Sequence, residues 1–139
     1  YVSSLYQGQV LETILQDVLD TPVSPELLPQ EDDKIVQKTE DIVGPYELHD
    51  FFIYHMVRFG DEPCKLYKKT KLAFKDKYDK ETIKKWLRLF YWRFFSQQFK
   101  RSCIPDGPKV GSVALSPRGD WRMPSDANVQ IWLDEVEKI

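Results

Sequence analysis

Apolar residues recur at helical spacing along most of this chain. In the first such stretch, Val10 to Leu19, the apolar side chains share one stripe of a helix with 3.6 residues per turn. The longest stretch runs from Asp79 to about Phe99, where aromatic residues widen the apolar face. No segment alternates apolar and polar residues with the period of two that is typical of strands. The pattern predicts a mainly α fold, a small helical cluster of about five helices with two long loops.

Helix-starting residues mark where the remaining helices are expected to begin. Asp and Ser side chains accept hydrogen bonds from the free N–H groups of a first turn, and proline is favoured as the first helical residue. The expected starts are Pro45 after Gly44, Asp61 before Pro63, Asp79, and Ser125. Gly60 is expected to end the helix that Pro45 opens, because glycine adopts the left-handed conformation that follows many helices.

Two long stretches without helical period are expected to be loops. Residues 21–41 contain three prolines and the acidic run Glu31-Asp32-Asp33. Residues 102–124 contain seven glycines and prolines, which stop helices and central strands. The second stretch also carries large or charged side chains, namely Lys109, Arg118, Trp121, Arg122 and Met123. We therefore expect an ordered loop that presents cations to an anion, with plain surface charge as the alternative.

The middle of the chain is strongly basic. Residues 61–101 carry 13 Lys and Arg against 5 Asp and Glu, a net charge of +8, whereas residues 1–60 carry a net charge of −8. This asymmetry indicates either an anionic partner or neutralisation between the two parts. The lysines alternate with residues expected in the core, so we expect a solvated outer face and no nucleic-acid binding. A nucleic-acid-binding domain remains an alternative.

Other functional classes have little support in the sequence. The 139 residues are enough for one ordinary domain. No apolar run approaches the roughly 18–20 residues needed to span a bilayer, and no signal peptide is recognisable, so we expect a cytoplasmic protein without a membrane partner. Cys64 and Cys103 are interpreted as free thiols. His49 and His55 do not form a set of three or four convergent ligands, so no metal site is expected.

Three irregular motifs resemble the bacterial glutamine-dependent NAD(+) synthetases. They are DTPVSPELLPQ at 20–30, KTEDIVGPYELHDFF at 38–52, and the tract that ends in GDWRMPSD at 119–126. The resemblance runs in order from roughly residue 5 to residue 137. It implies that residues 1–139 are the C-terminal segment of a synthetase domain, without its ATP-pyrophosphatase core or glutaminase domain. The helical cluster would then complete an α/β domain of the adenine nucleotide α-hydrolase-like type.

The resemblance also implies a reaction and candidate site residues. Members of this family are ligases that adenylate deamido-NAD with ATP and Mg²⁺, and ammonia from glutamine then displaces AMP to give NAD. Lys100 and Arg101 match the place of a lysine that holds deamido-NAD. Glu40 and Asp41 end a stretch that matches a loop closing over the active site, where closure excludes water. The alternative for Lys100 and Arg101 is that they complement a helix dipole.

The family's phosphate-binding loop has no counterpart in this chain. That loop reads Ser-Gly-Gly-x-Asp-Ser, and this chain has no adjacent glycines. We therefore expect ATP and Mg²⁺ to be bound mainly outside this segment, assign no catalytic residue, and expect the isolated segment to be inactive. Its expected partners are deamido-NAD, the rest of the synthetase chain with its glutaminase domain, and further copies in a homo-oligomer. The alternative from another class is a non-enzymatic helical interaction module, which the sequence upstream of Tyr1 would distinguish.

Overall fold

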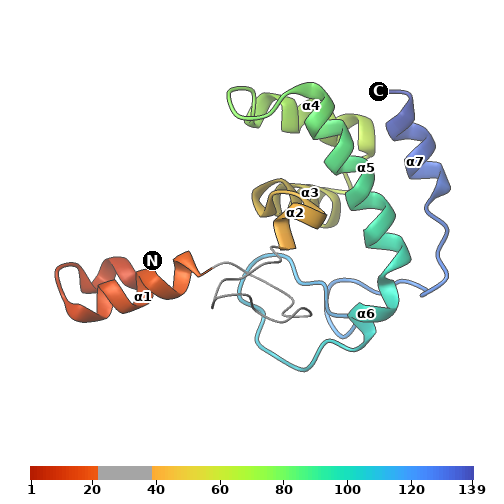
Figure 1. The fold of residues 1–139 in the computed structure, drawn as a ribbon. Coiled ribbons are helices and arrows are strands. Elements are labelled where there is room, and N and C mark those ends of the chain that lie inside the picture. The colour runs from red at the N-terminus through yellow and green to blue at the C-terminus, as the bar shows by residue number, and fades with distance from the viewer. Residues whose placement is uncertain (22–38) are drawn as a thin grey trace, which may run out of the picture. The chain divides into compact units, whose positions relative to one another are not determined.

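Helices form all the regular structure in residues 1–21 and 39–139, the part that the computed structural model describes (Figure 1). These residues belong to two compact units, Tyr1–Ile42 and Val43–Ile139, each of which is considered by itself. The elements in chain order are η1 (Ser3–Tyr6), α1 (Val10–Asp20), α2 (Thr39–Val43), α3 (Tyr46–Phe59), α4 (Pro63–Ala73), α5 (Lys80–Ser96), α6 (Gln98–Ser102) and α7 (Gln130–Glu137). The prediction of a mainly α chain is confirmed, with seven α-helices in the described residues rather than about five.

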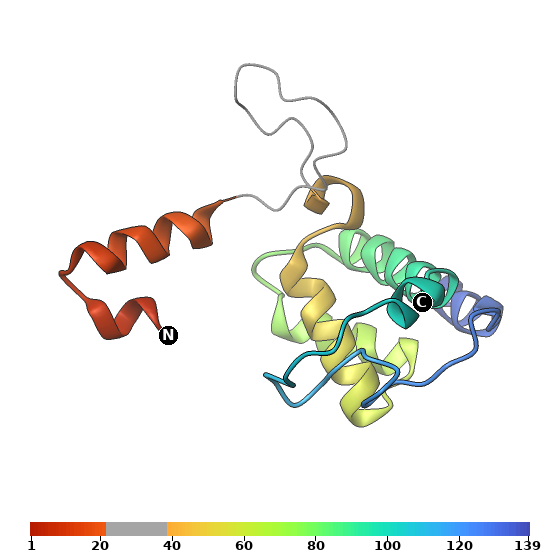
Figure 2. The ribbon, with the colours of Figure 1, turned by 90° about the horizontal axis from the view of Figure 1, so that it is seen from below.

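The first unit contains η1 and α1, which lie against each other (Figure 2). The N–H of Gly8 in the turn between them donates to the Glu12 carboxylate at 2.8 Å. None of the α1 residues is buried, so the stripe predicted for this helix stays largely exposed. Residues 22–38 of the loop expected at 21–41 lie outside the described residues. Thr39–Asp41 belong to α2, so that end of the predicted loop is helical.

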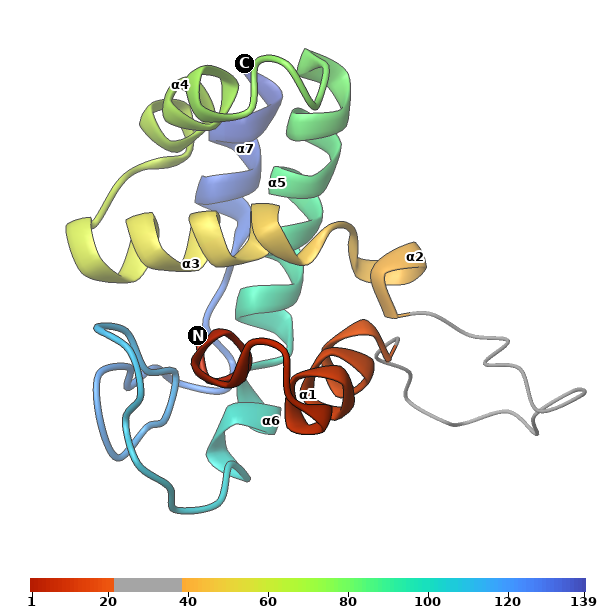
Figure 3. The ribbon, with the colours of Figure 1, turned by 90° about the vertical axis from the view of Figure 1, so that its left-hand side faces the viewer.

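The core of the second unit lies among α3, α4, α5 and α7. Figure 3 shows α7 alongside α5, with α3 crossing α5. The core is rich in aromatic rings, which pack edge-on or tilted, the arrangements that ring quadrupoles favour. The buried apolar residues are Leu48, Phe52, Met56, Leu66, Tyr67, Ile83, Leu87, Phe90, Tyr91, Phe94, Phe95, Leu133 and Val136. Burial of these faces stabilises α3, α4, α5 and α7.

Two of the predicted helix signals are confirmed in this unit. The Asp79 carboxylate accepts a hydrogen bond from the Thr82 N–H at 2.7 Å and caps α5. Gly60 follows α3 with a φ of 64°, and its N–H donates to the Met56 carbonyl at 3.0 Å. Pro45 precedes α3 as its cap rather than opening it as the first residue, a shift of one position.

Two expected caps are wrong. Glu62, not Asp61, is the residue before α4, and Val129, not Ser125, is the residue before α7. The side chain of Asp61 is fully buried and binds Lys65 and Lys69, so tertiary packing gives it a different role.

Candidate functional site

The end of α5 positions the two cations at 100 and 101. The helix expected to reach Phe99 ends at Ser96, and a separate short helix, α6, follows. At the junction, the Gln97 N–H still donates to the Arg93 carbonyl at 2.9 Å, while the Lys100 N–H donates to the Gln97 carbonyl at 3.0 Å. Lys100 and Arg101 therefore share the last turn of α6 at the edge of the core.

Arg101 holds α6 against the end of α5. Its guanidinium carbon lies 4.1 Å from the centre of the Phe94 ring. Its Nε donates to the Gln98 side-chain oxygen at 2.6 Å, and a terminal guanidinium nitrogen donates to the Phe94 carbonyl. Burial lowers the pKa of Arg101 from its ordinary value. Stacking and charge-assisted hydrogen bonds of this kind give Arg101 a structural function in addition to any contact with ligand.

Lys100 has a different environment on the same helix. Its side chain is exposed, and it makes no hydrogen bond or ion pair with any residue in the described part of the chain. Its ammonium group is therefore available to an external anion. The structure thus separates two neighbours that the sequence treats as equivalent.

The irregular stretch after α6 is tied together by its own polar groups. Asp120 binds Lys109 at 2.5 Å and accepts from the Ala114 N–H at 2.9 Å, and these two hydrogen bonds lower the pKa of Asp120. Arg118 binds Asp106 at 2.6 Å and donates to the Ile104 carbonyl. Two of the cations that were expected to face an anion, Lys109 and Arg118, therefore bind carboxylates and a carbonyl of the loop itself.

A cleft of about 480 Å³ lies between the two arms of this loop, 104–109 and 114–119. The loop is anchored by Trp121, whose ring packs edge-on against Phe94 with centroids 5.2 Å apart. The indole N–H of Trp121 is buried without a hydrogen-bond partner among the described residues, as are Arg93 Nε and Ser96 Oγ on α5. Buried polar atoms without partners are rare in native proteins. Three of them lie at the end of α5 and in the loop anchored on it.

Glu40 and Asp41 lie in the first turn of α2, and both are exposed. They belong to the unit Tyr1–Ile42, whereas Lys100 and Arg101 belong to the unit Val43–Ile139. Glu40 and Asp41 are thus neighbours on α2, and Lys100 and Arg101 are neighbours on α6. A site shared by all four residues remains a prediction.

Sequence reasoning treated the lysines at 65–75 as one solvated face, and the structure divides them into two groups. Lys65 binds the buried Asp61 carboxylate at 2.7 Å, and Lys69 binds it as well. Lys68 and Lys71 instead line a cleft between α4, α5 and α7. The net charge of +8 signalled a basic surface, but helical spacing alone did not distinguish the paired lysines from the cleft lysines.

Comparison with known proteins shows what this chain is similar to. It is 43% identical over 154 residues to the Glutamine-dependent NAD(+) synthetase of Mycobacterium leprae (strain TN), an alignment covering 98% of this chain and 22% of that protein. The proteins of the same name from Mycobacterium bovis (strain ATCC BAA-935 / AF2122/97) and Mycobacterium tuberculosis (strain ATCC 25618 / H37Rv) are 40% identical over 149 residues, covering 94% of this chain and 22% of each. No family model matches the chain.

The chain is homologous to a segment of larger synthetases. It spans about a fifth of the length of the relatives it matches. The relatives are the glutamine-dependent NAD(+) synthetases, so the resemblance carried by the three sequence motifs is confirmed. Within the described residues, no helix is long and apolar enough to cross a membrane.

Proposed function

We propose that this chain is the C-terminal segment of the synthetase domain of a glutamine-dependent NAD(+) synthetase. The whole enzyme would make NAD by ATP-dependent amidation of deamido-NAD with ammonia from glutamine, releasing AMP and pyrophosphate. The observation that carries the proposal is the identity of 40–43% over 94–98% of this chain to proteins of that name.

Within this enzyme, we assign Lys100 to contact with deamido-NAD. Its exposed ammonium group lacks an acidic partner in the described part of the chain, and deamido-NAD carries negative charge that a lysine can balance. Arg101 positions α6, because its guanidinium is engaged by Phe94 and Gln98. A direct contact between Arg101 and substrate remains part of the proposal.

We assign the ATP and Mg²⁺ of the proposed reaction to parts of the enzyme outside this segment. Mg²⁺ is usually held by one or two carboxylates together with substrate phosphates, and no group of three or more His, Cys, Asp or Glu gathers in the described residues. The chain also lacks adjacent glycines for a phosphate-binding loop. We therefore assign no ligand of this ATP or Mg²⁺ to the segment.

The remaining parts of the proposal concern closure and assembly. The stretch 21–41 would cover the bound substrate and exclude water from the adenylated intermediate, with Glu40 and Asp41 contacting substrate. Residues 22–38 of this stretch lie outside the described residues. The cytoplasmic location, the glutaminase partner domain and a homo-oligomeric assembly belong to the same proposal.

Substitution of Lys100 in the full-length enzyme tests the assignment. Lys100→Met keeps the aliphatic stem and removes the charge. Loss of a charge-assisted contact costs about 1.5–3 kcal/mol, so kcat/KM for deamido-NAD should fall by about one to two decades. The melting curve should change little, because the side chain is exposed.

Arg101→Met is the contrasting variant. It should lower the melting temperature, because it removes the stack on Phe94 and the hydrogen bond to Gln98. Unchanged kinetics of Lys100→Met together with a collapsed melting temperature would show that Lys100 is structural and would contradict the assignment. Absence of NAD synthesis by the full-length wild-type enzyme would contradict the proposed function itself.

A further inference from the structure

Two clefts meet at the end of the second unit formed by α4, the start of α5 and α7. One, of about 640 Å³, is lined by Cys64, Tyr67, Lys68, Lys71, Lys80, Glu135, Lys138 and Ile139. The other, of about 580 Å³, is lined by Lys71, Lys75, Tyr78, Asp79, Lys80 and Glu81. Lys71 and Lys80 line both clefts, so we call the two together the lysine cleft. Volumes of this order suit small ligands.

Lysines of the lysine cleft differ from those nearby. Lys65 and Lys69 bind Asp61, and Lys77 binds Glu47 at 2.5 Å. In contrast, no ion pair within the described residues engages the lysines that line the cleft, which are Lys68, Lys71, Lys75, Lys80 and Lys138. Like charges gathered at one hollow repel one another, and a bound anion would relieve that repulsion.

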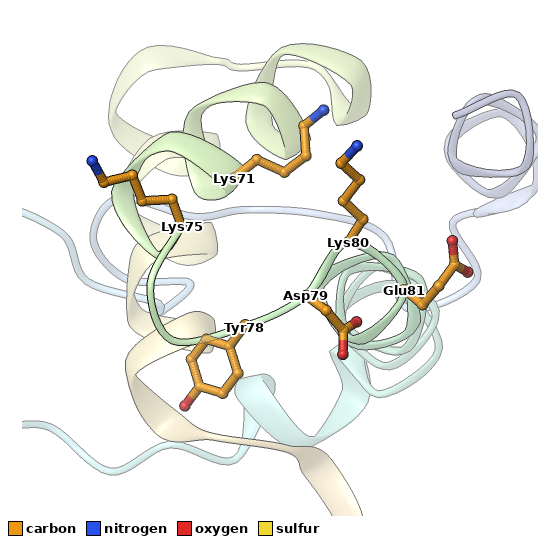
Figure 4. A pocket seen from close by; sticks show the side chains of 6 residues that line it. All are labelled: Lys71, Lys75, Tyr78, Asp79, Lys80 and Glu81. Carbon is orange, nitrogen blue, oxygen red and sulfur yellow. The ribbon is translucent and has the colours of Figure 1, made fainter.

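Two of the carboxylates of the lysine cleft accept hydrogen bonds from backbone N–H groups. Asp79 accepts from the Thr82 N–H at 2.7 Å, and Glu135 accepts from the Cys64 N–H at 3.2 Å. Figure 4 shows the side chains of Lys71 and Lys80 extending in the same direction, while the Asp79 carboxylate points the opposite way. Five lysines against the three side-chain carboxylates of Asp79, Glu81 and Glu135 leave the side chains of the lining with a net charge of +2.

Tyr67 belongs to the core and also lines the lysine cleft. Its hydroxyl donates to the Lys80 carbonyl at 3.4 Å, which links α4 to the first residue of α5. The Lys71 ammonium lies 4.7 Å from the centre of the Tyr67 ring. The ring is buried, so it holds Lys71 over a rigid surface next to Lys80. The positive end of the α5 dipole lies at the same place and also favours an anion.

We infer that the lysine cleft binds a small phosphate-bearing anion of the diphosphate or triphosphate class. The cleft gathers unpaired lysines from α4, from the start of α5 and from the residue after α7, and the lysines common to both hollows are Lys71 and Lys80, which suits a small ligand with several charges. The inference does not depend on the proposed function, because it uses no residue assigned to deamido-NAD.

Titration of the 139-residue chain with inorganic pyrophosphate tests this inference. The measurement is calorimetry in about 150 mM salt, where weak surface attraction is screened. The double variant Lys71→Gln with Lys80→Gln removes the two lysines common to both clefts. Its Kd should rise at least about tenfold, since two charge-assisted contacts are lost. In the wild-type chain, amide NMR signals of Tyr67, Lys71 and Lys80 should shift with pyrophosphate.

The matched control is the double variant Lys84→Gln with Lys85→Gln. It removes the same amount of charge from α5, outside the lysine cleft. Its Kd should stay within about twofold of the wild-type value, because screening weakens distant charges. Equal weakening in both double variants would show that net charge alone attracts the anion and would overturn the inference. Absence of pyrophosphate binding, or shifts confined to other residues, would overturn it as well.

Discussion

At the scale of single residues, Gly44 allows the backbone before α3 to lie close to α5. It lies between α2 and α3 with a φ of 93°, in the left-handed region where glycine has no steric penalty. A Cβ atom at this position would come within 2.5 Å of the Trp86 indole on α5. The backbone before α3 can therefore approach α5 because residue 44 has no side chain.

Gly44→Ala should destabilise the second unit by about 2–4 kcal/mol, from the overlap with Trp86 and the positive φ. Chemical denaturation measures this change. Gly60→Ala is the control, because Gly60 also has a positive φ but a Cβ atom there would meet no other atom within 4 Å. It should cost about 1–2 kcal/mol. Equal losses in the two variants would mean that contact with Trp86 contributes nothing.

Asp61 is a second residue whose importance comes from its surroundings. Burial raises the pKa of its carboxyl, but hydrogen bonds from Lys65 and Lys69 outweigh burial and bring the pKa to about 2, from an ordinary value of 3.8. A carboxylate with a lowered pKa in the folded state contributes stability above the unfolded pKa. That contribution is lost as the pH falls through 3.8 and then through about 2.

Asp61→Asn should therefore be less stable than wild type at pH 7, by roughly 1 kcal/mol after allowance for solvent around the lysine partners. Its free energy of unfolding should also decline less steeply between about pH 4 and pH 2. Urea denaturation across this pH range measures both effects. Asp76→Asn, at an exposed carboxylate, is the control and should follow the wild-type curve. An Asp61→Asn curve parallel to wild type would contradict the ion-pair assignment.

At the scale of elements, burial separates α1 from the other long helices. The 11-residue α1 has no buried residue, although its apolar stripe is well formed. The eight-residue α7 is shorter but buries Leu133 and Val136. Isolated helices shorter than about 12–15 residues are marginal in water, so packing rather than length should decide which helix persists.

Amide hydrogen exchange tests this difference in the 139-residue chain. The amides of α1 should exchange far faster than those of α5, and also faster than those of the shorter α7. The comparison of α1 with α7 is the informative one, because helix length alone favours the opposite order. Protection of α1 equal to that of α5 would show that another surface covers its apolar stripe.

At the scale of the whole molecule, the chain spans about a fifth of the relatives it matches. It contains no adjacent glycines, which the phosphate-binding loop of the family requires. The isolated 139-residue chain should therefore form no NAD from deamido-NAD, ATP and Mg²⁺, with either ammonia or glutamine. A turnover assay with the full-length enzyme as positive control measures this. Turnover by the pure 139-residue chain would contradict the assignment of the chemistry to other parts of the protein.

The sequence by itself determined what neighbouring residues specify. Helical periodicity located the main helices, and Asp79 and Gly60 marked ends that the structure confirms. These signals are local, because a cap or a left-handed glycine acts within one turn of its own helix. The three irregular motifs likewise carried the relation to the NAD(+) synthetases, which the comparisons confirm.

Only the tertiary structure decided how similar residues divide between roles. Arg101 stacks on Phe94, while the adjacent Lys100 stays exposed. Asp61, expected as a helix cap, is instead a buried partner of Lys65 and Lys69. The physical reason is that burial and charge pairing depend on residues brought together by packing. Local pattern therefore predicted the elements, and packing of α3, α4, α5 and α7 decided which charges remain free to bind a ligand.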